Sequence, residues 1–401
     1  MKEKADTSNV TITIKVKLAA DKESAASFDA VTIAYTKACN DVSKFLFDSG
    51  ELNMSTQTLH SNVYQGLRSV LKSQMACSVS RTVRSRYDAI ATQMENEPYV
   101  FECDGKRYTC KRDLDWLRRP VCFRKPFAEL VRGRDWSFVT VNGETRLSIN
   151  TLGKRRVVPY NHHFDDILFR DDVKLGRAIL LKKKGTWYLY ISATLKADIK
   201  RPKHIKGTDR GLRFVVTTYD GKDTTFVNGC DIAKKKAKYH NTRKSLQSKG
   251  TKGARRVLKR MSGRENRWMD DVNHCLSKTL VSEPETLIVL EDLTSISMHS
   301  DKGKEFNREL SSWAFYDLEQ KIVYKAALAG NRVINVPARY TSQRCPKCGS
   351  IDKANRNRKE HLFRCRKCGY TSNDDRVAAM NLYELGRRYL KTGNIKGFPK
   401  Q

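Results

Sequence analysis

Hydrophobic and polar residues change their period within the first hundred residues. Apolar and polar side chains alternate without a break from 10 to 18, which predicts a half-buried strand. Asp21 can cap a helix, and apolar residues between positions 28 and 45 then recur at steps of three and four. This period predicts a helix that ends near Gly50, and a similar series from 59 to 70 begins a second helix.

Strand-like segments dominate from about position 99 to 195. Glycine, asparagine and charged residues separate short apolar runs there, and an aromatic-rich run at 187–195 closes the series. The pattern predicts a β-barrel formed by residues 1–20 and 96–200. A helical lobe of residues 21–95 interrupts that barrel.

Beyond a basic linker at 200–203 the pattern becomes mixed α/β. Strand-like segments lie at 205–218, 223–228, 286–291 and 332–336, and helical stretches lie at about 232–282, 308–330 and 376–392. This order favours an RNase H-like domain. We therefore predict a multidomain α+β protein, with that domain at 204–339 and 373–393, an insertion at 340–372 and a tail at 394–401.

The charge of the chain points to a polyanionic partner. Lysine and arginine number 77 against 44 acidic residues, so the formal charge is +33. An excess of this size favours nucleic acid over neutral partners. No run of 18 apolar residues is present, so no membrane insertion is expected, and Met1–Lys4 leads almost directly into a strand without a secretory leader. Most of the eleven cysteines are scattered, as in a cytosolic chain with reduced thiols.

Four cysteines have the spacing of a structural zinc site. Cys345 and Cys348 form one C-x2-C couplet, and Cys365 and Cys368 form a second after sixteen residues. Two such turns can complete a tetrahedral thiolate shell around one Zn²⁺, and four thiolates leave no open position for catalysis. A second metal site, built from Cys103, Cys110 and Cys122 with His162 and His163, is less favoured because these residues lack couplet spacing.

Three carboxylates lie at points where elements begin or end. Asp209 stands between two glycines where a strand is expected to enter a sheet, Glu291 follows a short apolar strand, and Asp375 begins the last helix. Each could serve instead as a turn residue or a helix cap. Together they fit a site in which three carboxylates hold two Mg²⁺ about 4 Å apart and hydrolyse a phosphodiester.

With these residues placed, the chain resembles the TnpB nucleases of transposons and the miniature type V-F CRISPR effectors. The resemblance covers about residues 205–385 and rests on five motifs, at 207–211, 289–293, 340–349, 365–370 and 375–381. The first two hundred residues resemble the family only in layout, as a wedge barrel interrupted by a helical recognition lobe. The resemblance implies a RuvC-like nuclease domain with an inserted zinc ribbon that binds target nucleic acid.

Position by position, the family's catalytic triad falls on Asp209, Glu291 and Asp375, and its zinc ligands fall on the four couplet cysteines. We choose Asp375 over Asp374 by counting three residues back from Ala378. The chain departs from the family twice. Arg210 replaces a residue that is usually apolar, and Val377 stands where asparagine is common.

The resemblance implies an RNA-guided, metal-dependent DNA endonuclease of the prokaryotic cytosol or nucleoid. Its partners would be a guide RNA, either omega-type or CRISPR RNA, and double-stranded target DNA beside a short motif. Its cofactors would be two Mg²⁺, with Mn²⁺ as a substitute, and one Zn²⁺. A transposon nuclease would be a monomer, whereas a CRISPR effector could be a homodimer on one guide. Candidate backbone contacts are Lys234, Lys235, Lys236, Arg255, Arg256, Lys259, Arg260, Arg344 and Arg364.

Two other functions stay open at this point. A zinc-ribbon DNA-binding repressor would bind without cutting, whether guided or unguided. An unguided, structure-selective RuvC-like nuclease would cut branched DNA without RNA. The basic residues could also form an ordinary exposed face of long helices.

Overall fold

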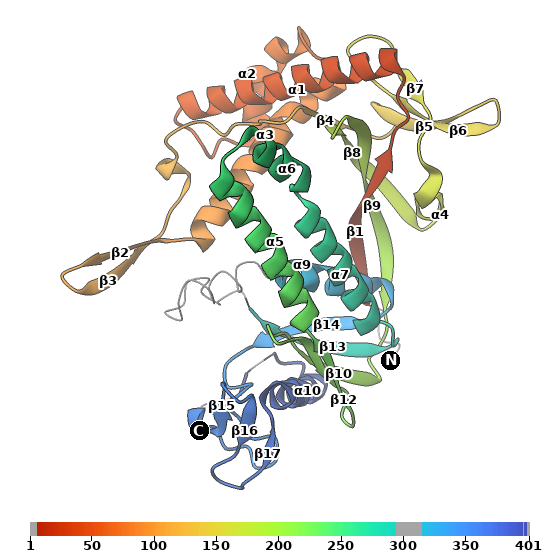
Figure 1. Cartoon of the computed structure of the whole chain (residues 1–401). Coiled ribbons are helices and arrows are strands. Elements are labelled where there is room, and N and C mark those ends of the chain that lie inside the picture. The colour runs from red at the N-terminus through yellow and green to blue at the C-terminus, as the bar shows by residue number, and fades with distance from the viewer. Residues whose placement is uncertain (1–5, 294–314, 396, 399–401) are drawn as a thin grey trace. The chain divides into compact units, whose positions relative to one another are not determined.

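The computed structural model describes residues 6–293, 315–395 and 397–398 (Figure 1). By its contacts the chain divides into two compact units, one of Thr11–Leu195 and one that combines Met1–Val10 with Lys196–Gln401. Within the described residues, every helix is too short or too polar to cross a lipid bilayer.

Three helices follow the first strand, as the hydrophobic period predicts. They are α1 (Lys22–Asp48), α2 (Thr56–Arg68) and α3 (Ser73–Asn96). The Asp21 carboxylate caps α1 by accepting a hydrogen bond of 2.7 Å from the backbone N–H of Ser24. The last residue of the apolar series at 59–70 lies beyond this helix, because α2 ends at Arg68.

The strands around these helices pair in three groups. They are β1 (Asp6–Lys17), β2 (Tyr99–Cys103), β3 (Lys106–Cys110), β4 (Phe127–Leu130), β5 (Trp136–Val141), β6 (Glu144–Ile149), β7 (Arg156–Val158), β8 (Val173–Lys183) and β9 (Thr186–Ile199), with a short helix α4 (Asp165–Leu168). One sheet has the order β1-β9-β8-β4, a second has β5-β6-β7, and β2 and β3 form a hairpin. The expected barrel strands thus belong to two sheets, which an isolated bridge between Leu18 and Tyr160 connects.

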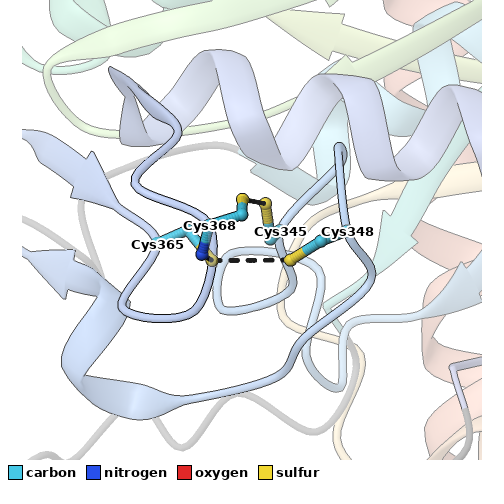
Figure 2. Close-up of side chains that lie close together, drawn as sticks. All are labelled: Cys345, Cys348, Cys365 and Cys368. Carbon is cyan, nitrogen blue, oxygen red and sulfur yellow. Dashed lines mark hydrogen bonds between the residues drawn. The ribbon is translucent and has the colours of Figure 1, made fainter.

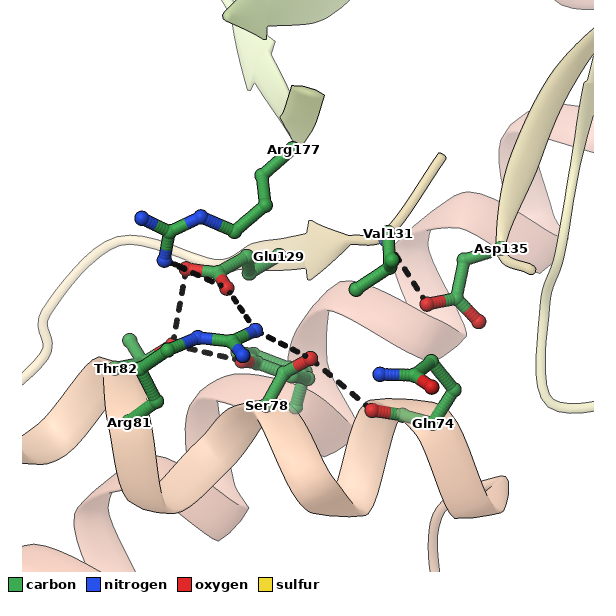
Figure 3. Close-up of polar contacts among 9 residues, drawn as sticks. Gln74, Ser78, Arg81, Thr82, Glu129, Val131, Asp135 and Arg177 are labelled. Carbon is green, nitrogen blue, oxygen red and sulfur yellow. Dashed lines mark hydrogen bonds and ion pairs between the residues drawn. The ribbon is translucent and has the colours of Figure 1, made fainter. Parts of the chain in front are cut away.

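A buried carboxylate ties the helices of this unit to its larger sheet (Figure 3). Glu129 on β4 accepts a hydrogen bond of 2.8 Å from Arg81 of α3 and pairs with Arg177 of β8 at 3.3 Å. The hydroxyl of Thr82 donates to the same carboxylate at 3.3 Å. Because burying a lone charge is costly, these donors explain how β4 tolerates an acid in an apolar core.

The second unit is built on a five-stranded sheet. Its strands are β10 (His204–Asp209), β11 (Phe214–Tyr219), β12 (Thr224–Asn228), β13 (Thr286–Asp292) and β14 (Arg332–Pro337), in the order β12-β11-β10-β13-β14. β10, β13 and β14 are parallel to one another, and β11 and β12 pair antiparallel. The single strand expected at 205–218 is therefore two strands joined by a turn at Gly211, whose N–H donates to the carbonyl of Phe214 at 3.1 Å.

The long helical stretch expected at 232–282 is three helices. They are α5 (Cys230–Lys249), α6 (Lys252–Met261) and α7 (Arg264–Leu280). The breaks fall at Gly250 and Gly263, which both have positive φ and so end a right-handed helix. Later come α9 (Phe315–Leu328) and α10 (Asp374–Thr392); the start of the helix expected at 308–330 lies outside the described residues.

Different helices cover the two faces of the five-stranded sheet. Ile288 and Leu290 of β13 pack with residues of α7 and α9 in one cluster, and Leu287 and Val289 pack with α10 in another. This alternation is the two-residue period of a strand that is buried on both faces. α10 can lie close to the sheet because Gly207 has no side chain. A Cβ at this position would collide with backbone atoms of the helix.

A small antiparallel sheet lies between β14 and α10 in the chain. Its strands are β15 (Arg356–Asn357), β16 (Leu362–Arg364) and β17 (Thr371–Asn373). Phe363 of β16 packs against Val377 of α10 in a separate buried cluster. We refer to residues 340–373 as the ribbon segment.

Candidate active site and metal centre

The three predicted carboxylates stand on three elements of the second unit. Asp209 is the last residue of β10, Glu291 lies near the end of β13, and Asp375 is in the first turn of α10. Asp209 therefore lies where its strand leaves the sheet, and the expectation that the strand enters the sheet there was wrong. Because β10 and β13 are parallel, both of their acids lie at the same edge of the sheet.

The register of the two strands brings Asp209 and Glu291 side by side. Thr208 pairs with Leu290, so the next step along both strands sets the two acids opposite each other. Gly207 and Val289, two residues earlier, both face α10. Since side chains two apart share a face, both acids project to the face that α10 covers. The N-terminal turn of α10 brings Asp375 to that face.

Burial acts on all three acids, and repulsion by nearby acids adds to it. Burial raises the pKa of Asp209 well above its usual value, and the charges of Glu291 and Asp375 raise it further. Burial also raises the pKa of Glu291 and of Asp375. A cluster of buried carboxylates is costly unless cations compensate it, and oxygen ligands are those that Mg²⁺ prefers. The donor set therefore fits divalent hard cations.

The start of α10 separates the roles of two adjacent acids. Asn373 caps the helix by accepting hydrogen bonds from the backbone N–H groups of Asp375 and Arg376, at 3.0 and 3.1 Å, so neither aspartate is the cap. Asp374 is fully buried and binds Arg356 of the ribbon segment at 2.7 Å. Asp375 instead acts on the pKa of Asp209 and of Glu291. Asp374 is thus held by Arg356, and Asp375 is the acid of this pair whose charge affects Asp209 and Glu291.

The ribbon segment brings a cation that the sequence interpretation missed. Arg356 also lies 3.8 Å from Asp375, and its charge opposes the rise in pKa of Asp209 and Glu291. Its neighbours in the chain include several other basic residues, so no sequence signal singles it out. His361 is also close, with Nδ1 3.4 Å from Asp374.

The tightest acid group differs from the predicted triad. Within the described chain, His361, Asp374 and Asp375 offer ligand atoms that all lie within 4.8 Å of one another. Asp209 and Glu291 do not belong to that group, although charge links them to Asp375. The three triad carboxylates are thus buried near one another, but they are less tightly grouped than His361, Asp374 and Asp375.

A polar chain positions Glu291 from the ribbon side. The hydroxyl of Thr341, which is buried, donates to the carboxylate of Glu291 and lowers its pKa against the effect of burial. Asn381 of α10 then donates its side-chain amide to the carbonyls of Thr341 and Arg344, at 2.7 and 2.8 Å. Helix α10 therefore holds the loop that orients Glu291.

The departure at Arg210 has a structural explanation. Its guanidinium is buried and pairs with Glu319 of α9 at 2.7 Å. It also donates a hydrogen bond of 2.6 Å to the backbone carbonyl of Glu291. An apolar residue at this position would leave Glu319 without this partner, so the arginine and Glu319 fit each other as a pair.

The four couplet cysteines meet in the ribbon segment (Figure 2). Their sulfur atoms all lie within 4.8 Å of one another, with 3.6 Å between Cys345 and Cys368 and between Cys348 and Cys365. Tetrahedral Zn–S bonds of about 2.3 Å place sulfur atoms about 3.8 Å apart, so the four thiols fit one zinc ion. A hydrogen bond from the backbone of Ser350 helps to lower the pKa of Cys348 to about 7, whereas burial raises the pKa of Cys345 to about 12.

The two couplets have the same backbone turn. The N–H of Gly349 donates to the carbonyl of Cys345, and the N–H of Gly369 donates to that of Cys365, each at 2.9 Å. Both glycines have positive φ, at 80° and 70°, which a side chain would strain. The alternative thiols behave differently: Cys103, Cys110 and Cys122 are exposed and form no metal-binding group with His162 or His163 among the described residues.

Most of the candidate nucleic-acid contacts are exposed. Those on α5 and α6 are exposed except for Lys236, which is half-buried, and Arg364 of β16 is also exposed. Lys235 lies over the ring of Trp268 at 4.5 Å. Arg344 is used inside the protein, since it binds the side chain of Asn381 at 3.1 Å and lies over the ring of Phe398 at 4.4 Å.

Comparison with known proteins gives this fold and site a family. The chain is 30% identical over 241 residues to a TnpB-like protein of Methanocaldococcus jannaschii, and the match covers 57% of this chain and 84% of that protein. The chain belongs to the TnpB family. A family model described as Cas12f1-like, TNB domain, matches residues 315–382 of this TnpB-family chain.

Miniature type V-F effectors are also similar to this TnpB-family protein. The CRISPR-associated endodeoxyribonuclease Cas12f1 of Sulfoacidibacillus thermotolerans is 34% identical over 222 residues, which is 50% of each chain. The chain spans about half the length of the Cas12f1 relatives that it matches. A cryo-EM structure of a Cas12f1-sgRNA-target DNA complex has a TM-score of 0.57 at 14% identity, covering 89% of this chain and 81% of that one. That likeness shows a shared fold.

Proposed function

We propose that this TnpB-family protein is an RNA-guided DNA endonuclease that hydrolyses DNA at Asp209, Glu291 and Asp375. The observation that carries the proposal is the convergence of these acids from β10, β13 and α10 on one face of the sheet. Their raised pKa values support a role as cation ligands, because a buried acid with a purely structural role would usually form an ion pair with a basic side chain. The related Cas12f1 is named as an endodeoxyribonuclease.

The three acids would hold two divalent cations such as Mg²⁺ or Mn²⁺, which activate water and stabilise the leaving oxygen of a phosphodiester. The protein's own side chains do the remaining work. Thr341 orients the carboxylate of Glu291, and Arg356 sets a positive charge beside the acids, where it can contact a phosphate. The sheet and α10 hold the acids at fixed positions.

Under this proposal the second unit is a RuvC-like nuclease whose inserted ribbon segment holds one zinc ion. The first unit would combine the wedge and the recognition lobe. A guide RNA would pair with the target strand, and the exposed basic residues of α5 and α6 would contact phosphates by charge. The charge of +33 is consistent with a large bound polyanion.

The test is cleavage of matched double-stranded DNA by the protein with the RNA that co-purifies with it. We expect cleavage in Mg²⁺ and none with a chelator. A variant with Asp209→Ala, Glu291→Ala and Asp375→Ala should bind RNA and DNA but not cut. Asp231→Asn, at an acid whose side chain is 98% exposed, is the matched control and should cut normally.

Three outcomes would change the proposal. Cleavage by the triple variant would refute the assigned site. Binding without any product in Mg²⁺ or Mn²⁺ would indicate a repressor. Cleavage of branched DNA in the absence of RNA would indicate an unguided nuclease. The sequence of the co-purified RNA would also distinguish a transposon nuclease from a CRISPR effector.

A further inference from the structure

An isolated hairpin in the first unit carries a row of exposed aromatic rings. β2 and β3 extend beyond the end of α3 (Figure 1), and every residue of both strands is exposed. The turn is Asp104–Gly105, with φ of 52° and 69°, which is the backbone of a tight two-residue hairpin turn. A two-stranded hairpin without a core is marginally stable in water, so side-chain pairs must hold it.

The rings all lie on one face of the hairpin. Phe101 pairs with Tyr108 across the strands, and Tyr99 is two residues before Phe101, so these three side chains point the same way. Ring centres are 5.4 Å apart for Phe101 and Tyr108 and 5.9 Å for Tyr99 and Phe101, with planes tilted by only 20° and 24°. Trp116 extends the row, 5.7 Å from Tyr99.

These rings are open to solvent and lie in a basic region. Between 40% and 50% of the surface of Tyr99, Phe101, Tyr108 and Trp116 is exposed. From the start of the hairpin at position 99 to position 125, eight basic residues stand against four acidic ones, and the hairpin itself has two of each. Of these eight, only Arg112 forms an ion pair within the described residues, with Glu97 at 3.7 Å. The exposed rings thus adjoin a segment, 111–125, that carries six basic and two acidic residues.

We propose that this aromatic face binds a single strand of nucleic acid by stacking its unpaired bases on Tyr99, Phe101, Tyr108 and Trp116. Near-parallel rings offer flat faces to successive bases, while the neighbouring lysines and arginines attract the phosphates. A protein partner would need acidic residues to match the same region. The inference goes beyond the proposed function, because it requires neither a guide nor a cut.

The test measures equilibrium binding of fluorescent oligonucleotides of about 12 nucleotides to the nucleic-acid-free full chain. The ligands are oligouridine, oligothymidine, an abasic strand of equal charge, and a duplex. The double variant Phe101→Val and Tyr108→Val removes two rings but keeps residues that favour strands. We expect it to bind the two base-bearing strands about tenfold more weakly for each ring, with unchanged affinity for the abasic strand and the duplex.

Two controls separate stacking from folding. Val100→Ala with Thr109→Ala alters the register pair on the opposite face and should bind normally. Phe101→Tyr with Tyr108→Phe keeps both rings and should also bind normally. Weaker binding of oligouridine or of oligothymidine by the valine variant supports the proposal. The strand that is affected shows whether the site accepts ribose or deoxyribose.

The proposal is overturned if the valine variant binds base-bearing strands as well as the unaltered chain does. It is also overturned if the affinity of that variant for the abasic strand falls as much as its affinity for the base-bearing strands. The rings would then only support the hairpin. Reduced self-association of the valine variant in sedimentation, with unchanged binding of the oligonucleotides, would make the face a contact between copies. Circular dichroism and cleavage of guided DNA report separately on folding and on the nuclease.

Discussion

At the scale of single residues, the candidate acids could be named from the sequence, whereas the residues that contact them could not. Asp209, Glu291 and Asp375 stand at positions where a motif and an element boundary coincide, and both features can be recognised in the chain. Arg356 and Thr341 act through contacts between distant segments. Hydrophobic periodicity contains no information about such contacts, so these two residues emerge only from the structure.

The burial of Asp209 and its repulsion by the neighbouring acids predict a stability change in metal-free protein. Because folding raises the pKa of Asp209, its contribution to stability is present below the ordinary aspartate pKa and is lost as the pH rises through the raised value. Asp209→Asn should therefore raise the melting temperature at neutral pH in a chelator, by about 2–4 °C for each kcal/mol of repulsion removed. Calorimetry should show the difference vanish near pH 4. A destabilised variant at neutral pH would contradict this.

The hydroxyl that orients Glu291 predicts a loss of rate. Thr341→Val keeps the size of the side chain but removes the donor, so Glu291 loses the contact that fixes its rotamer. Groups behind a metal ligand typically change activity by about 10- to 100-fold, and we expect a fall in the cleavage rate of that size. Thr371→Val, at an exposed ribbon threonine, is the matched control. Equal rates for both variants would remove Thr341 from the site.

At the scale of elements, periodicity predicted most helices and strands but not their interruptions. The predicted strand at 10–18 and the helix after Asp21 are confirmed. The turn at Gly211 and the helix breaks at Gly250 and Gly263 were missed, although each interruption falls at a glycine. Of the two glycines on either side of Asp209, Gly207 makes room for α10, and periodicity does not predict this close approach.

That close approach predicts the most sensitive glycine of the sheet. A Cβ added at Gly207 would overlap the backbone of α10 at Ala379 and Tyr383, and neither can move without shifting the helix. Gly207→Ala should destabilise the protein by about 1–3 kcal/mol or more. Gly253→Ala on α6 has open space around it and should stabilise by up to about 1 kcal/mol. Denaturant unfolding of both variants checks the prediction, and equal shifts would contradict it.

At the scale of the whole molecule, the pairing of distant strands was the least predictable feature. The order β12-β11-β10-β13-β14 joins segments separated by a long helical excursion, and the first unit divides its strands between two sheets and a hairpin. Neither arrangement follows from the period of any one segment. The mixed α/β character and the cysteine cluster, in contrast, could be predicted from local patterns.

Metal removal should affect both the ribbon segment and the active site. Cys345→Ser with Cys365→Ser removes the two buried ligands, and we expect the zinc content to fall from about one per chain to near zero by mass spectrometry. Cleavage should fall as well, because Thr341 and Arg356 belong to the ribbon segment. Cys230→Ser, at an exposed isolated thiol, should keep zinc and activity. Normal cleavage by the zinc-free variant would show that the ribbon segment keeps its shape without metal.

The order of the elements along the chain sets when the site can first exist. Two of its acids, on β10 and β13, leave the ribosome well before the third, which begins α10. Helix α10 also covers the sheet face to which Asp209 and Glu291 project. A nascent chain that has not yet released residues 374–392 therefore lacks the third acid and the helix that covers the other two, so the candidate site cannot form before this helix has been synthesised.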